Sequence, residues 1–318
     1  MPWSFGKSPI SLHLTVVIAE LTRRQPWQDV ARMLGIYWNT IRAAISRAVE
    51  YGLKQRDTSG VSCIGIDEIS RRKRFVYQTN VYDLKEPRLL WTGADRGAAT
   101  LEQFFELWGE ERINKLYAIC CDMWDPYIKS IKEKAPQAIL VFDKFHIIKH
   151  LNTAVDNVRK QEYREKKEQN PELLKGTKYI WLKNPENLTD RQRVRLSRLE
   201  KLNLKINRAY LLKESFKKVY EYQYPANAEK YLKWWCTKAM RSRLEPMKKF
   251  VKQLRRYWDN VVTYFKVGIT NARVEGLNRK AKVVSTRAYG YKSSETFALA
   301  LYHALGQLPL PETIHKFL

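Results

Sequence analysis

The sequence predicts an α/β fold: a mixed, helix-covered sheet that is preceded by a small helical domain and interrupted by a helical insertion. Three changes of pattern lead to this prediction. Apolar residues recur at helical spacing up to about residue 57, follow a strand-like period between residues 62 and 142, and then return to helical spacing in a strand-free stretch. We therefore expect four segments, at residues 1–57, 58–150, 151–257 and 258–318.

The first segment has the spacing of a helix-turn-helix. Helices are expected at residues 9–23, 27–34 and 39–51, with Gly35 at the turn four residues after the small Ala31. In such a motif the start of the last helix meets bases and phosphates. The residues expected to do so here are Trp38, Asn39, Thr40 and Arg42. A helical hairpin that serves only packing is the alternative.

The second segment alternates strands with helices. Strands are expected at residues 63–66, 74–82, 88–92, 116–121 and 138–142. Helices are expected at residues 101–108 and 127–134, between the last three strands. Three consecutive strands followed by strand–helix alternation predict a mixed sheet covered by helices.

The composition indicates a folded protein with a polyanionic partner. The 58 Lys and Arg residues against 33 Asp and Glu residues give a formal charge of +25. Basic residues are concentrated between residues 144 and 218, where we expect a nucleic-acid role. With 44% hydrophobic residues, the chain is too apolar for a disordered basic tail. It contains neither a spanning apolar stretch nor a secretory signal, so we expect a soluble cytoplasmic protein.

The cysteines point to no metal site or disulfide framework, because they form no C-x-x-C pair. Buried thiols are the expected state of Cys63, Cys120 and Cys121, which lie inside apolar runs. The fourth cysteine is Cys236.

Two aspartates follow apolar runs that we predict to be strands. Asp67 ends the run at residues 63–66, and Asp122 ends the run at residues 116–121. If these strands are parallel neighbours, both carboxylates project from one edge of the sheet. That arrangement suits Mg²⁺, which takes one or two protein carboxylates and keeps its other positions for water and phosphate oxygens.

A third carboxylate is expected on a helix at residues 271–284. Its polar stripe consists of Asn271, Glu275, Asn278 and Lys282. Its apolar stripe consists of Val274, Leu277, Ala281 and Val284. Docking of the apolar stripe on the sheet would tilt Glu275 toward the two aspartates. The basic residues expected to meet DNA phosphates are Arg273, Arg279, Lys280 and Lys282. An ordinary amphipathic helix with a solvent-facing glutamate is the alternative.

Other polar residues near the strand ends are weaker candidates. Glu68 should point to the opposite face of the strand from Asp67. Asp125 lies beyond its strand, where it would cap a helix. Asp143 and His146 follow the fifth strand and are candidates to orient metal-bound water or a phosphate, with a structural hydrogen-bonded pair as the alternative.

Five strings of residues, in this order, resemble those of a known family. They are IGIDEI at residues 64–69, CDMWDPY at 121–127, FDKFHI at 142–147, MRSRLEPM at 240–247 and VEGLNRKAK at 274–282. They are similar to those of the insertion-sequence L-three (ISL3) family of bacterial DDE transposases. The similarity runs from about residue 3 to residue 309.

The resemblance implies a ribonuclease H-like core, with Asp67, Asp122 and Glu275 as the catalytic, metal-binding carboxylates. It implies two Mg²⁺ or Mn²⁺ ions, cleavage of double-stranded DNA at transposon ends, and strand transfer into target DNA. At least a dimer on DNA, associated with the bacterial nucleoid, is also implied. The family usually carries a cysteine-based zinc-binding segment before the helix-turn-helix, and we expect this chain to lack it, because its first cysteine is Cys63.

Two rival functions fit part of the pattern. A noncatalytic helix-turn-helix regulator would explain the charge but leave Asp67 and Asp122 without a purpose. A ribonuclease H-like nuclease would share the core but lack strand transfer.

Overall fold

The computed structural model describes residues 9–72, 76–267 and 272–312. The chain divides into two compact units. Unit 1 comprises residues 1–140 and 271–318, and unit 2 comprises residues 141–270. The finer division into four segments stays a prediction.

Unit 1 begins with the three helices that the sequence predicts. They are α1 (Leu12–Arg24), α2 (Trp27–Leu34) and α3 (Trp38–Gln55). Gly35 ends α2 with φ +64°, a left-handed conformation that glycine adopts without steric cost. The turn thus forms where the sequence places it.

These helices share their core with the end of the chain. Ile18, Val30 and Ile41 are fully buried, in a cluster with Ala300 of α15 (Ser294–Leu305) and with Leu308. The N-terminal helices are therefore stabilised by a helix that follows them by more than 200 residues in sequence.

His303 of α15 is a buried polar contact within this core. Its Nε2 lies 2.9 Å from the Ala19 carbonyl oxygen and 3.0 Å from the Thr22 hydroxyl. Burial, with a smaller contribution from the positive charge of Arg23, lowers the pKa of His303 to about 4. The neutral ring is therefore the form that the fold accommodates.

We expect unit 1 to lose stability as the pH falls from about 6.5, the pKa of an unfolded histidine, toward 4. The unfolded state binds the proton more readily than the folded state. Neutral His303 therefore contributes about 3 kcal/mol to the free energy of unfolding above pH 6.5, and this contribution is lost by about pH 4. Denaturant unfolding between pH 7 and pH 4 measures the pH dependence of stability in the wild type and in His303→Gln, whose side chain does not titrate. Parallel pH curves for the two proteins would contradict the assignment.

The centre of unit 1 is a five-stranded mixed sheet, as predicted, and its strand order is β3-β2-β1-β4-β5. Its strands are β1 (Cys63–Arg72), β2 (Val76–Asp83), β3 (Arg88–Ala94), β4 (Ala118–Cys121) and β5 (Ile139–Phe142). β1 pairs antiparallel with β2 and parallel with β4, and β2 pairs antiparallel with β3. The boundary with unit 2 falls within β5.

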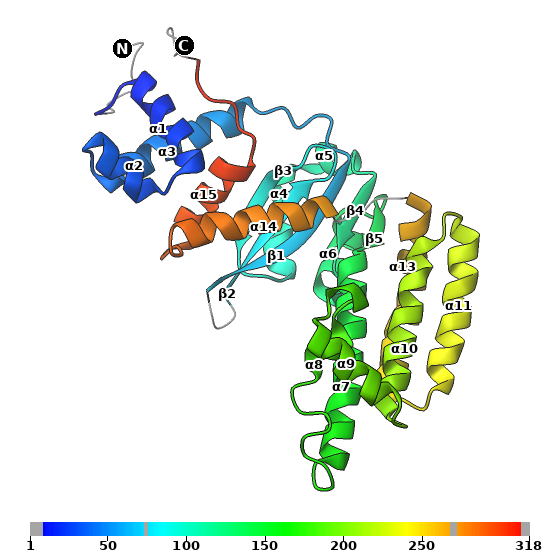
Figure 1. Cartoon of the computed structure of the whole chain (residues 1–318). Coiled ribbons are helices and arrows are strands. Elements are labelled where there is room, and N and C mark those ends of the chain that lie inside the picture. Colours follow the sequence, from blue (N-terminus) through cyan, green and yellow to red (C-terminus); the bar gives the residue numbers. More distant parts are fainter. Residues whose placement is uncertain (1–8, 73–75, 268–271, 313–318) are drawn as a thin grey trace. The chain divides into compact units, whose positions relative to one another are not determined.

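Helices cover both faces of this sheet (Figure 1). One face carries α14 (Ala272–Arg287), which contacts β1, and α15, which contacts β3. The other carries α4 (Ala98–Trp108) and α6 (Asp125–Lys134), while α5 (Glu110–Asn114) follows α4. The predicted start of the last helix, Asn271, lies outside the described residues.

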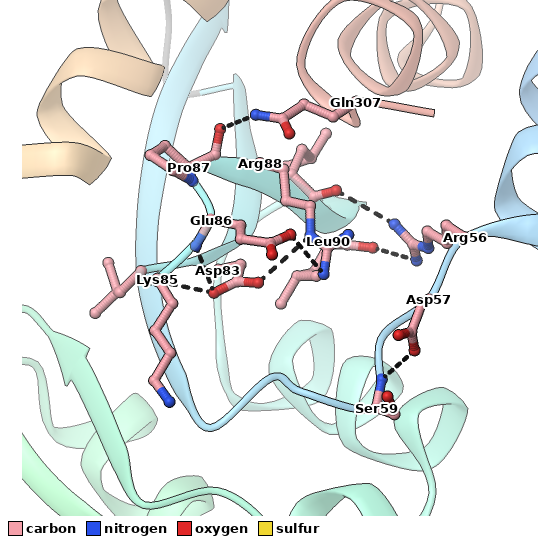
Figure 2. A network of polar contacts seen from close by, with 12 residues as sticks. Arg56, Asp57, Ser59, Asp83, Lys85, Glu86, Pro87, Arg88, Leu90 and Gln307 are labelled. Carbon is pink, nitrogen blue, oxygen red and sulfur yellow. Dashed lines mark hydrogen bonds and ion pairs between the residues drawn. The ribbon is translucent and has the colours of Figure 1, made fainter. Parts of the chain in front are cut away.

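A polar network fixes the β2–β3 turn and ties it to the end of α3 (Figure 2). The Asp83 carboxylate accepts hydrogen bonds from the backbone N–H groups of Lys85 and Glu86 and lies 3.4 Å from Arg88 Nε. Arg56, which follows α3, donates to the carbonyl oxygens of Leu89 and Leu90 in β3. These bonds join the N-terminal helices to the sheet through the backbone of β3.

Unit 2 is helical, as predicted for the insertion. Its longer helices are α7 (Lys144–Lys166), α9 (Asp190–Glu200), α10 (Lys205–Lys217), α11 (Pro225–Arg241), α12 (Glu245–Arg256) and α13 (Trp258–Val267). Short ones are α8 (Lys178–Leu182), η1 (Pro185–Asn187) and η2 (Lys218–Glu221). Trp181, Phe216 and Trp235 fill its core. Beyond the end of β5, the described residues of unit 2 form no strand.

All four cysteines are buried thiols, as predicted for Cys63, Cys120 and Cys121. Within the described part of the chain, no helix combines the length and the apolar character that a membrane crossing requires.

Candidate active site

Asp67 lies on β1, and Asp122 directly follows β4, the strand that neighbours β1. β1 and β4 pair in parallel, with Gly65 opposite Cys120. If this register continued for two residues past the end of β4, Asp67 would be level with Asp122 and both side chains would share one face. Neighbouring strands are about 4.8 Å apart, so the predicted pairing of strand-borne carboxylates has a basis in the backbone.

One expectation about Asp67 is wrong: it does not end its strand. β1 continues to Arg72, because residues beyond Asp67 keep pairing with β2, down to Ser70 opposite Tyr77. What ends at this level is β4, whose last residue is Cys121. Asp67 therefore lies where the parallel partner stops and one side of β1 opens.

A chain of hydrogen bonds orients the Asp67 carboxylate. Its Oδ1 accepts from the backbone N–H of Glu68 at 2.8 Å, and its Oδ2 accepts from Asn278 Nδ2 of α14 at 2.6 Å. Asn278 Oδ1 in turn accepts from the Tyr82 hydroxyl at 2.7 Å. Helical periodicity places Asn278 on a polar stripe but predicts neither of these contacts. We call this chain of hydrogen bonds the Tyr82–Asn278–Asp67 relay.

Two members of the relay are buried, and burial keeps the Tyr82 phenol protonated. Tyr82 is fully buried, and Asn278 is only 7% exposed. Burial, and then the negative charge of Asp67, raises the pKa of Tyr82 far above its ordinary value. The phenol therefore stays protonated and donates to Asn278, which leaves the amide N–H for Asp67.

Asp122 is held by the turn that follows β4. Its Oδ1 accepts from the Met123 N–H at 2.6 Å, and its carbonyl oxygen accepts from the Trp124 N–H at 2.8 Å. The guanidinium carbon of Arg96 lies 4.8 Å from the ring centroids of both Trp124 and Tyr77. Arg96 is exposed, and its contact with Trp124 brings a cation near the turn that holds Asp122. No periodic pattern in the sequence marks Arg96.

Glu275 lies on α14 one turn before Asn278, the residue that contacts Asp67. Three members of the predicted apolar stripe, Val274, Leu277 and Ala281, are buried, whereas the fourth, Val284, is half-buried. The Glu275 carboxylate is 42% exposed and lies 2.9 Å from Arg279 of the next turn. Among the described residues, no group of three or more His, Cys, Asp or Glu side chains is arranged to hold a metal ion. That Glu275 joins the aspartates stays a prediction.

The weaker acidic candidates occupy other positions. Glu68 hydrogen-bonds Tyr127 of α6 and so faces away from Asp67, as predicted. Asp125 is the first residue of α6, whereas Trp124 precedes it as the cap, so the predicted capping role is wrong. Its carboxylate still lies in the first turn, where the helix dipole favours negative charge.

Asp143 and His146 belong to unit 2 and contact each other. Asp143 caps α7, because its Oδ1 accepts from the Phe145 N–H at 3.0 Å. Its Oδ2 lies 3.3 Å from His146 Nδ1. The pair thus has a structural role at the start of α7, and an auxiliary role in catalysis stays a prediction.

The predicted DNA contacts on α3 differ in exposure. Asn39 and Arg42 are exposed, and Thr40 is half-buried. Trp38 packs against the N-terminal core, with its ring centroid 6.1 Å from that of Trp27. Asn39 and Arg42 are therefore the better placed to reach DNA.

The predicted DNA contacts on α14 also differ. Arg279, Lys280 and Lys282 are exposed. Arg273 instead donates to the carbonyl oxygens of Leu84 and Lys85, which follow β2. These bonds anchor the start of α14 to the sheet.

Comparison with known proteins identifies the family. A family profile described as "Transposase", that of the ISL3 group of DDE transposases, matches residues 64–301. The transposase for insertion sequence element IS1001 of Bordetella parapertussis is 27% identical over 304 residues, which cover 95% of this chain and 75% of that protein. The transposase for insertion sequence element IS1557 of Mycobacterium tuberculosis is 27% identical over 305 residues, which cover 88% and 68%. The chain, which carries Asp67 on β1 and Asp122 directly after the parallel neighbour β4, belongs to the ISL3 family of DDE transposases.

Proposed function

We propose that this DNA transposase cleaves and joins DNA by metal-dependent phosphoryl transfer, with Asp67, Asp122 and Glu275 as the metal-binding carboxylates. The observation that supports the proposal is the parallel pairing of β1, which carries Asp67, with β4, which Asp122 directly follows. The substrate is double-stranded DNA at the transposon ends and then target DNA. Because two ends have to be brought together, the active form on DNA is at least a dimer.

The donor set fits a pair of Mg²⁺ or Mn²⁺ ions. Hard divalent cations prefer carboxylate oxygens. Asp67 and Asp122 supply such oxygens, each oriented by a backbone N–H bond to one carboxylate oxygen. When bound, the ions would activate the attacking oxygen and stabilise the leaving oxygen.

The chain's own residues position these groups. The Tyr82–Asn278–Asp67 relay keeps one aspartate in a single orientation, which lowers the cost of reorganisation on binding. Glu275 has to leave Arg279 before it can join the aspartates. DNA phosphate competes with Glu275 for this 76% exposed guanidinium, so substrate binding would release the carboxylate.

The surrounding parts of unit 1 take roles that follow from this function. We assign the mixed sheet with its covering helices to a ribonuclease H-like core, on the support of its three antiparallel strands followed by a parallel one. We assign α2 and α3 to a DNA-reading helix-turn-helix, on the support of the glycine turn and the exposed Asn39 and Arg42. The formal charge of +25 favours such a partner.

A plasmid assay tests the proposed reaction. The purified chain is mixed with Mg²⁺ and a plasmid that carries the DNA flanking its gene, together with a second plasmid as target. The account predicts cuts at defined ends and joined products that contain both plasmids. Cuts without joined products would favour a nuclease, and binding without cuts would contradict metal-dependent catalysis.

Replacing Asn39 or Arg42 by Ala should reduce the preference for end DNA over random DNA by about 5- to 100-fold, because good base contacts contribute about 1–3 kcal/mol of discrimination. Competition binding with both DNAs measures the ratio. Glu50→Ala, an exposed change on the same helix α3, is the control. Equal losses on both DNAs would make Asn39 and Arg42 phosphate contacts instead.

A further inference from the structure

Unit 1 contains a pocket of about 610 Å³ that the proposed chemistry does not use. It is lined by the first turn of α2, by Trp38 of α3 and by residues 287–293, which join α14 to α15. Pockets of about 300–1,000 Å³ hold small ligands. None of the three carboxylates Asp67, Asp122 and Glu275 lines it.

The inner wall of the pocket is aromatic. The ring centroid of Trp27 lies 6.1 Å from those of both Trp38 and Tyr291. Tyr291 packs in turn on the buried Phe297, at a centroid distance of 5.2 Å. Rings that support one another in this way form a preorganised wall for a flat ligand.

At the rim, the chain places a tyrosine where glycine is usual. α14 ends in a Schellman motif, in which Gly290 N–H donates to the Ser285 carbonyl oxygen and Tyr289 N–H to that of Thr286. Tyr289 occupies the left-handed position of this motif, with φ +51°. A side chain there strains the backbone, yet this ring is fully exposed and gains no packing.

The lining carries positive charge. It includes three cations, Arg32, Arg287 and Lys292, and a single carboxylate, Asp29, which lies 3.5 Å from Arg32. Arg287 donates to the carbonyl oxygens of Arg23 and Arg24, so its hydrogen bonds fix its position without neutralising it. The pocket therefore combines stacking surfaces with a lining in which basic residues outnumber acidic ones.

We propose that this pocket binds an unpaired nucleotide of the DNA substrate, with its base against Tyr289 and the aromatic wall and its phosphate at Arg287 and Lys292. The inference rests on DNA as the substrate of the proposed function. Every base has a π face, so aromatic platforms hold bases that have left the helical stack, and cations hold the adjoining phosphates. A base within an intact duplex cannot enter such a pocket, so the site distinguishes unpaired from paired DNA.

The test measures binding by the full chain in EDTA, where no cleavage occurs. The probes are a 30-base-pair duplex with a four-nucleotide single-stranded extension and the blunt duplex of the same sequence. The extension carries 2-aminopurine, whose fluorescence falls when it stacks. We expect the wild type to prefer the extended duplex and to quench the probe.

Tyr289→Gly is the informative variant, because it removes the ring while relieving the backbone. We expect it to weaken binding of the extended duplex by about 5- to 100-fold, to leave the blunt duplex unchanged, and to raise the melting temperature of the protein. Tyr289→Phe should behave as the wild type. Tyr224→Ala, at an exposed tyrosine of unit 2, is the matched control and should change neither affinity.

Wild-type affinity of Tyr289→Gly for the extended duplex, or equal losses on both duplexes, would overturn the proposal. Asp67→Asn separates it from the catalytic assignment. This variant should bind the extended duplex as the wild type does, whether or not Asp67 proves to be needed for cleavage.

Discussion

Glu275→Gln is expected to abolish end cleavage, with a loss of about 1,000-fold or more, while DNA binding stays close to that of the wild type. Glutamine keeps the size and the helical fit, so buried Val274 and Leu277 still dock α14 on the sheet. It removes the negative charge that a hard divalent ion requires. Several kcal/mol of transition-state stabilisation disappear with the ion, and each 1.36 kcal/mol is a factor of ten in rate.

The measurement pairs a cleavage assay in Mg²⁺ or Mn²⁺ with a gel shift on the same DNA. Glu106→Gln, at an exposed glutamate of α4, is the matched control and should cleave normally. Arg279→Gln should also retain cleavage at saturating DNA, because it removes the partner that Glu275 has to leave and only one of several phosphate contacts. Normal cleavage by Glu275→Gln would exclude this residue as a metal ligand.

The second large effect is expected at Asn278, which we assign to positioning rather than to direct catalysis. Asn278→Leu keeps the volume but removes the bond to Asp67 and leaves the buried Tyr82 hydroxyl without its acceptor. Residues that orient metal ligands typically contribute 10- to 100-fold in affinity or activity. We expect a loss of that size in cleavage and a matching rise in the Mg²⁺ concentration for half-maximal rate.

A smaller effect of the same kind is expected for Tyr82→Phe, which removes only the far end of the relay. A purely structural role would lower stability without moving the metal dependence, so the Mg²⁺ titration decides between the two. Val283→Ala, an exposed change on the same helix, is the control. An unchanged Mg²⁺ requirement in Asn278→Leu would contradict the positioning role.

Much of the sheet could be predicted because it depends on local patterns. The apolar runs before Asp67 and Asp122 identify β1 and β4, and alternation with helices is enough to predict that the sheet is mixed. The end of β1 could not be predicted in this way. Its polar residues beyond Asp67 are extended only because β2 pairs with them, and that pairing is a tertiary effect.

In the candidate site too, features that depend on local patterns could be predicted, and features that depend on tertiary contacts could not. Residue type and strand position mark Asp67 and Asp122. Helical periodicity only places Glu275 on a polar stripe, and the family resemblance makes it the third candidate. The role of Asn278 depends on a contact with a residue 211 positions away, for which no local signal exists. The conformation of Tyr289 could not be predicted either. Its backbone is left-handed, and at such a position local sequence rules expect a glycine.

The central claim is that Asp67, Asp122 and Glu275 together hold the divalent ions. The most direct measurement is Mn²⁺ binding, followed by electron paramagnetic resonance, to the full chain in complex with end DNA. We expect the wild type to bind two Mn²⁺ per active site, and Asp67→Asn, Asp122→Asn and Glu275→Gln each to lose at least one ion or bind both much more weakly. Wild-type Mn²⁺ stoichiometry and affinity in all three variants would contradict the account.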